Sequence, residues 1–149
     1  MTRDEYELDI CTRSGAAVDV PFKPDAFIEE WKPRVAECHD NVDYWVKHHV
    51  GYTEVRGWIY LMGSEPGPVV YTAHSVVRGP DGELFDITPL YNNDERRGLF
   101  ITHVGDDATF LAMRTGIFIT LRCQGDCSAP PLDPMWALQQ YVLEPDEAL

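Results

Sequence analysis

The stretch VVYTAHSVVRGPDGELFDITPL, residues 69–90, decides the fold of this chain. It contains a β-branched run, a Gly-Pro-Asp-Gly turn and a second, shorter run, a pattern typical of a β-hairpin. His74 lies in the first run and Asp86 in the second. Whether these two side chains share a face depends on the length of the turn, because a shift of one residue moves every side chain of a strand to the opposite face.

The turn sequence favours a three-residue loop. A two-residue loop would need a positive φ that Pro80 cannot adopt, and it would place Asp86 on the opposite face from His74. A type I turn with Pro80 at its second position, followed by Gly82 in the left-handed conformation, suits the sequence instead. The expected cross-strand pairs are then Gly79 with Glu83, Val76 with Asp86, and His74 with Thr88. In this register His74 and Asp86 are diagonal neighbours on one face, about 7 Å apart at the backbone.

A helix is predicted upstream, over about residues 36–50. Its apolar residues have the spacings of a helix with one buried face, and they are Val42, Trp45, Val46 and Val50. Cys38 lies in the first turn, four residues before Val42, so it points to the same buried side. We expect this helix to cover the His74 face of the hairpin near one end.

The remaining segments predict a single α+β domain over residues 1–149, with N-terminal helices packed on a mainly antiparallel sheet. Further strands are expected at residues 5–12, 52–62, 99–104 and 117–122. Further helices are expected at residues 26–31 and 105–114, the latter capped by Asp106 or Asp107. Residues 91–98 resemble an exposed loop, and a Pro-rich C-terminal tail begins at about residue 123.

Composition excludes several classes of protein. Twenty-five acidic and 12 basic residues give a net charge of -13, which repels nucleic acid and anionic membranes. The apolar runs are shorter than the roughly 18 residues of a membrane span. The charged start, MTRDEYELD, has no signal-peptide core, so we expect a cytoplasmic protein, with secretion by a leaderless route left open.

Three cysteines besides Cys38 need an explanation. Cys123 and Cys127 have a spacing found in zinc sites and could be joined there by Cys11 or His103, but a second paired motif is lacking. A disulfide or two idle thiols is the preferred interpretation. We therefore expect no metal and no cofactor.

Cys38, His74 and Asp86 together suggest nucleophilic catalysis. A thiolate at a helix N-terminus is favoured by the unpaired N–H groups there and by a neighbouring imidazolium. The histidine can then protonate a leaving group, while a carboxylate on its other nitrogen orients the ring. The alternative is structural: a buried cysteine, a histidine satisfied by a strand neighbour and an aspartate that stabilises a turn.

The order of these residues resembles the core of the papain-like and transglutaminase-like cysteine enzymes: a cysteine at a helix start, a histidine on a strand, and an aspartate on the next strand. The segment AHSVVRGPDGELFDITP is similar to the His-turn-Asp segment of the transglutaminase-like branch, and the resemblance covers about residues 38–89. It implies Cys38 as nucleophile, His74 as base and Asp86 as orienting residue. The implied reaction is hydrolysis or acyl transfer at an amide bond of a protein or peptide, of the peptidase, amidase, deamidase or transglutaminase type.

The chain departs from that family in its oxyanion stabilisation. Many papain-like enzymes have a glutamine before the cysteine, whereas every glutamine here lies downstream of residue 123. The backbone at Cys38, the side chain of His39 or that of Asn41 would have to serve instead. The alternative function is a catalytically inactive domain of the same type that binds a basic protein partner through its acidic surface.

Overall fold

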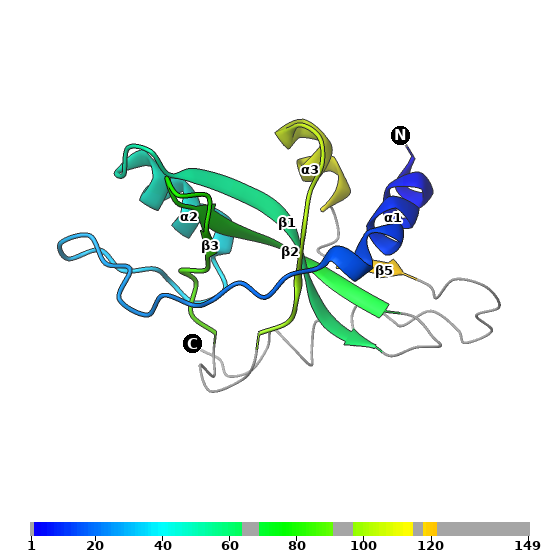
Figure 1. Cartoon of the computed structure of the whole chain (residues 1–149), viewed down its shortest axis with the longest axis horizontal. Coiled ribbons are helices and arrows are strands. Elements are labelled where there is room, and N and C mark those ends of the chain that lie inside the picture. The colour runs from blue at the N-terminus through cyan, green and yellow to red at the C-terminus, as the bar shows by residue number, and fades with distance from the viewer. Residues whose placement is uncertain (1, 64–68, 91–96, 115–117, 122–149) are drawn as a thin grey trace.

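The computed structural model describes residues 2–63, 69–90, 97–114 and 118–121, and side chains are described outside 61–69 and 115–121 (Figure 1). Within these ranges the elements are α1 (Arg3–Thr12), a 3-10 turn η1 (Ser14–Ala16), α2 (Cys38–Lys47), β1 (Thr53–Gly63), β2 (Val69–Arg78), β3 (Leu84–Phe85), β4 (Phe100–Thr102), α3 (Asp107–Met113) and β5 (Phe118–Leu121). All four strand pairings are antiparallel, which confirms the α+β prediction. The expected tail from residue 123 lies outside the described residues.

The sheet is built on the long β1–β2 pair, with strand order β3-β2-β1-β4. β5 also pairs with β2, through residues 69–72, while β3 pairs with residues 77–78. Because β1 occupies one edge of β2, both β3 and β5 must lie on the other edge. Between β3 and β5 lie residues 73–76 of β2, which include His74. In the described part of the chain, no strand pairs with them on that edge.

The three-residue turn of the hairpin is present. The ladder pairs Val77 with Phe85, and Gly79 donates its N–H to the carbonyl of Glu83 at 2.9 Å. Gly82 has a φ of 88°, the left-handed conformation that the turn requires. The predicted register is therefore confirmed where the strands pair.

The paired part of the hairpin is shorter than predicted, because Asp86 leaves the ladder after Phe85. Its N–H donates to the carbonyl of Pro21 at 2.8 Å, and its own carbonyl accepts from the N–H of Lys23 at 2.8 Å. Residues 21–23 thus hold the backbone of Asp86 from a distant part of the sequence.

The helix α2 packs on the face of the sheet opposite to the one expected. Val42 and Trp45 are buried as predicted, but they pack with Val77 and Ile87. Val77 points away from His74 because side chains alternate along β2. Val50, expected on the buried stripe, follows the end of the helix and is fully exposed.

The segment at residues 5–12 is part of helix α1, so the predicted strand was wrong. Tyr6 and Ile10 are four residues apart and both buried, which fits a helix as well as it fits alternation, whereas Leu8 is 62% exposed. A capping box between Thr2 and Glu5 fixes the start of the helix. Tyr6 and Ile10 pack with Trp58 and other large apolar residues of the core.

The short helix predicted at residues 26–31 is also wrong. Ile28 and Trp31 exchange backbone hydrogen bonds of 3.0 and 2.8 Å across a turn, and Glu29 has a φ of 53°. Pro24 and Pro33 confine the segment to too few residues for a stable helix.

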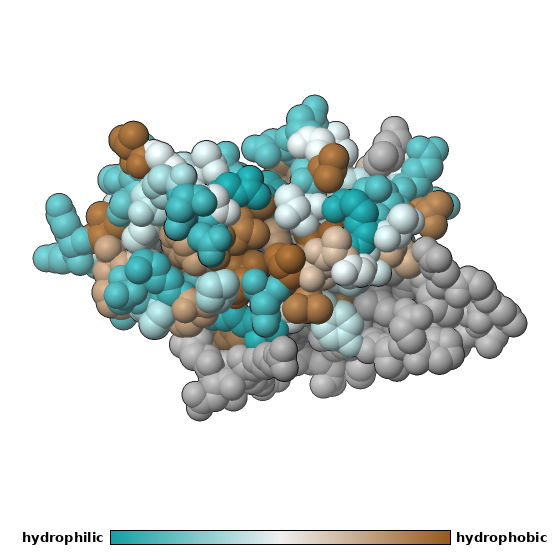
Figure 2. Space-filling view, viewed as in Figure 1, coloured by the Kyte–Doolittle hydropathy of each residue, from teal (hydrophilic) through white to brown (hydrophobic). Residues whose placement is uncertain are grey.

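The C-terminal half of the described chain follows the predictions. β1, β4, α3 and β5 all occur where expected, and Asp106 caps α3 by accepting from the N–H of Thr109 at 2.8 Å. Trp58 and Phe110 are buried core residues. Polar and apolar side chains are interspersed over the face in Figure 2, with apolar ones gathered over its middle. Within the described ranges, no helix combines the length and the apolarity needed to cross a bilayer.

Candidate active site

Cys38 is the first residue of α2, and the chain enters this helix through a strained conformation. Ala36 has a φ of 64°, a left-handed conformation that costs a residue with a side chain about 1–3 kcal/mol. Glu37, at the N-cap position, makes no side-chain capping bond. The first-turn N–H groups therefore keep their positive partial charge next to the thiol of Cys38.

Asn41 holds this entry in place. Its side-chain oxygen accepts from the N–H of Arg34 at 3.0 Å, and its amide nitrogen donates to the carbonyl of Arg34 at 2.8 Å and to the hydroxyl of Thr88 at 3.0 Å. Both amide hydrogens are thus in use, which favours a clamp for Asn41 over a role as oxyanion donor.

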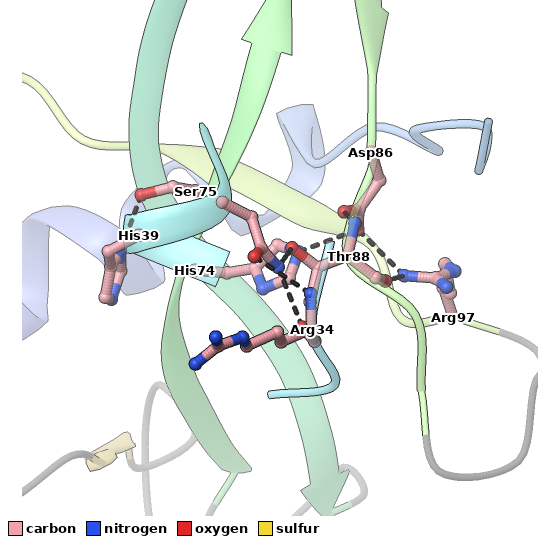
Figure 3. A network of polar contacts seen from close by, with 8 residues as sticks. Arg34, His39, His74, Ser75, Asp86, Thr88 and Arg97 are labelled. Atoms are coloured by element: carbon pink, nitrogen blue, oxygen red, sulfur yellow. Dashed lines mark hydrogen bonds and ion pairs between the residues drawn. The ribbon is translucent and has the colours of Figure 1, made fainter. Parts of the chain in front are cut away.

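His74 and Asp86 meet as the hairpin register requires. The Nε2 atom of His74 lies 2.7 Å from an Oδ of Asp86, and both residues are buried (Figure 3). The other carboxylate oxygen accepts from the N–H of Thr88 at 3.0 Å. Because Asp86 occupies Nε2, the nitrogen of His74 that is left to face Cys38 is Nδ1.

Arg97 belongs to the site although the sequence pattern assigned it to an exposed loop. Its side chain is only 10% exposed. Its guanidinium donates to Asp86 at 3.0 Å and to the carbonyl of Thr88 at 2.8 Å, and it lies 4.1 Å from the ring centre of Phe22. The signal in the sequence was weak, because Arg97 follows a run of charged residues that is typical of a solvated loop.

The electrostatics of the site favour a charge-separated pair. Burial alone would raise the pKa of the Cys38 thiol, but the charge on His74 and hydrogen bonding by His39 and His74 lower it to about 5. Burial alone would lower the pKa of His74, but the carboxylate of Asp86 and the thiolate of Cys38 raise it to about 10. Between these values the site holds a thiolate and an imidazolium.

Asp86 remains ionised across the same range. Burial alone would raise its pKa, but the imidazolium of His74, the guanidinium of Arg97 and the N–H of Thr88 together hold it below its usual value. The carboxylate can thus orient the ring of His74 without taking up its proton.

Cys38 and His74 each shift the pKa of the other, so the two side chains lie close together. α2 lies on the Ser75–Val77 face of β2, whereas the side chain of His74 points to the other face. A contact between them has to pass around the edge of β2, and residues 73–76 leave that edge open between β3 and β5.

His39, the other sequence-predicted oxyanion candidate, also reaches the site. Its Nδ1 lies 2.6 Å from the hydroxyl of Ser75 on the helix-covered face of β2, and His39 also helps to lower the pKa of the neighbouring Cys38. Because Ser75 engages Nδ1, the nitrogen of His39 that remains for Cys38 is Nε2.

The residues considered for zinc do not gather in the described part of the chain. There, no group of three His, Cys, Asp or Glu side chains has an arrangement that could hold a metal ion. Both nitrogens of His103 are engaged, one with the hydroxyl of Tyr6 at 2.6 Å and one with the carbonyl of Asp106 at 2.9 Å. Cys123 and Cys127 lie outside the described residues.

Comparison with known proteins adds no name to this geometry. No family model, no curated protein and no solved structure matches the chain. The chemistry must therefore be argued from the site itself.

Proposed function

We propose that this protein is a cysteine-nucleophile enzyme with a papain-like or transglutaminase-like core, acting on an amide bond through an acyl-enzyme. The observation that carries the proposal is the position of the His74 ring, which has the carboxylate of Asp86 at Nε2 and the thiol of Cys38 on its other side. This is the arrangement that activates a cysteine and keeps an acid ready for the leaving group.

The proposed reaction follows from these three groups. The thiolate of Cys38 attacks the carbonyl carbon, the S–C bond forms, and the carbonyl electron pair moves to oxygen. His74 gives its Nδ1 proton to the departing nitrogen as the tetrahedral intermediate collapses to a thioester. His74, now neutral, accepts a proton from water or from an amine, which attacks the thioester and releases the acid or the new amide.

A protein or peptide with basic residues is the substrate class that the charge favours. The net charge of -13 raises the local concentration of cationic partners and repels anionic ones.

The first experiment tests acylation of Cys38 without knowledge of the natural substrate. The protein is mixed with p-nitrophenyl acetate, an activated ester, and the released nitrophenol and the mass of the tryptic peptide 35–47 are followed. We expect a burst equal to the enzyme concentration and one acetyl group on Cys38. Cys38→Ser should abolish the burst, and Cys11→Ser, a matched change in helix α1, should retain it.

The second experiment identifies the reaction type. An unfolded basic protein is supplied as amide donor, and new peptide ends, released ammonia and incorporation of a labelled primary amine are measured in parallel. If Cys38 takes no acetyl group and none of the three products forms while the basic protein still binds, the chain is an inactive binding module and the enzymatic proposal is wrong.

A further inference from the structure

A second chain of polar contacts leads to Cys38 from the helix-covered face of β2. The hydroxyl of Ser75 lies 2.6 Å from Nδ1 of His39 and accepts a hydrogen bond of 3.0 Å from Arg56 (Figure 3 shows the His39–Ser75 pair). Ser75 is completely buried. The guanidinium is in turn held by Asp43 at 2.9 Å. This arm has no residue in common with the His74–Asp86–Arg97 arm.

The direction of the protons along this arm follows from its last member. Arg56 is always protonated and can only donate, so the hydroxyl of Ser75 accepts from it. The hydrogen of that hydroxyl is then free to be donated to Nδ1 of His39. A neutral imidazole that accepts at Nδ1 carries its own hydrogen on Nε2, the nitrogen left to face Cys38.

We propose that Arg56 and Ser75 are positioning residues that hold His39 as the Nε2–H tautomer, so that His39 acts at Cys38 as a hydrogen-bond donor and not as a base. The inference rests on the proposed function and assigns the oxyanion stabilisation that the sequence left open. In this proposal His74 transfers the proton, and His39 donates a hydrogen bond without transferring a proton.

The donor is useful because negative charge moves during the attack. In the resting site the charge is on the sulfur of Cys38, and once the S–C bond forms it is on the former carbonyl oxygen. An N–H that is held beside the sulfur can stabilise the negative charge first on the sulfur and then on the oxygen, without having to move. The ring of His39 is also held in orientation by the edge of Phe110, whose ring centre is 5.7 Å away.

The tautomer can be measured directly, without any substrate. Long-range ¹H–¹⁵N correlation spectra of protein labelled in its histidines distinguish Nδ1–H from Nε2–H, and His39→Gln identifies the signals of His39 by their loss. We expect the Nε2–H pattern in the wild type and a mixed or Nδ1–H pattern in Ser75→Ala. An Nδ1–H pattern in the wild type would overturn the inference.

A matched pair of substitutions tests the donor itself. The amide nitrogen of glutamine can occupy the position of Nε2, whereas that of asparagine reaches only to Nδ1. In the nitrophenyl acetate burst we expect His39→Asn to slow acylation about 100-fold, and His39→Gln to stay within about tenfold of the wild type. Thermal unfolding of both variants checks that the fold is retained.

The outcomes separate this inference from the proposed function. If wild-type Cys38 takes no acetyl group and none of the three products forms, the proposed function itself fails. If the burst is present but His39→Asn and His39→Gln acylate at the same rate, the proposed function stands and the donor role of His39 is wrong.

Discussion

Replacing His74 by glutamine should separate the thiolate of Cys38 from its counter-ion while leaving the fold intact. The glutamine amide can still donate toward Asp86. The carboxylate also keeps its contacts with Arg97 and with the N–H of Thr88, each at 3.0 Å. The change therefore removes the imidazolium without leaving Asp86 unpaired in the interior.

The magnitude of the effect follows from the pKa of Cys38. With the imidazolium present this pKa is about 5, and without it we expect a return toward the ordinary value of 9.0. At pH 6 the thiolate fraction then falls from about 0.9 to about 0.001. A thiolate of higher pKa is intrinsically more nucleophilic, by about 60-fold over four units at a Brønsted slope of about 0.45. The net alkylation rate should thus fall only about 15-fold at pH 6.

The same arithmetic predicts that the two rate profiles cross. Above the crossing, near pH 7, the variant should react faster than the wild type, by about fivefold at pH 8, and the two profiles should converge as the imidazolium of His74 is lost near pH 10. Iodoacetamide labelling over the pH range, read from the tryptic peptide 35–47, gives both profiles for Cys38 alone. A wild-type profile that rises only near pH 9 and coincides with that of His74→Gln would refute the ion pair.

Three further predictions concern stability. Asp86→Asn should lower the free energy of unfolding by about 3–5 kcal/mol in urea titrations, because it leaves Arg97 buried without its carboxylate; a loss below 1 kcal/mol would contradict the burial argument. Gly57→Ala should lower the free energy of unfolding by about 1–3 kcal/mol, because the added Cβ would lie 2.3 Å from a backbone oxygen of β4. Gly15→Ala serves as the control, since a Cβ at that position would meet no other atom within 4 Å. The stability of the wild type minus that of Cys38→Ser should rise with pH from about 5, become level once His74 of the variant, whose pKa Asp86 still raises, has lost its proton, and fall between 9.0 and about 10. The unfolded His74 is the same in both proteins and cancels, so the changes of slope come from the thiol of the wild type and from His74 in the two folded proteins; a pH-independent difference would exclude the pair.

The contact between His74 and Asp86 could be predicted because it depends on local chemistry. Pro80 and Gly82 determine the turn, the turn determines the register, and the register places both side chains on one face. Each of these steps uses residues that are close in sequence, whereas the two backbone bonds of Asp86 to residues 21–23 are long-range contacts that the local pattern does not indicate.

The strand predicted at residues 5–12 failed because two periodicities overlap there. Tyr6 and Ile10 satisfy both alternation and the helical spacing of four, so burial of these two residues does not distinguish the structures. The decisive signal was present in Thr2 and Glu5, which have the spacing of a capping box. The hydrogen bonds between Thr2 and Glu5 fix the start of the helix locally. A strand, by contrast, would need a neighbouring strand to pair with its backbone N–H and C=O groups.

Arg97 and Arg56 could not be predicted, because no local pattern distinguishes them from solvated arginines. Each is brought to the site by pairings between distant segments, Arg56 by the register of β1 on β2 and Arg97 by the return of the chain to β4. Their partners, Asp86 and Ser75, are polar residues that are almost completely buried. A buried polar residue needs a hydrogen-bond partner. These two residues were therefore the indication in the sequence that charged side chains approach from other segments.

The site also depends on a segment that contributes no reactive group. A regular β3 would extend along residues 73–76 and close the edge of β2 at which Cys38 approaches His74. β3 ends at Phe85, and residues 21–23 hold the backbone of Asp86 with two hydrogen bonds of 2.8 Å. These bonds fix the backbone from which the carboxylate of Asp86 reaches Nε2 of His74 at 2.7 Å. Residues 21–23 thus support the orientation of Asp86 on which the proposed chemistry depends, although they contribute no reactive group.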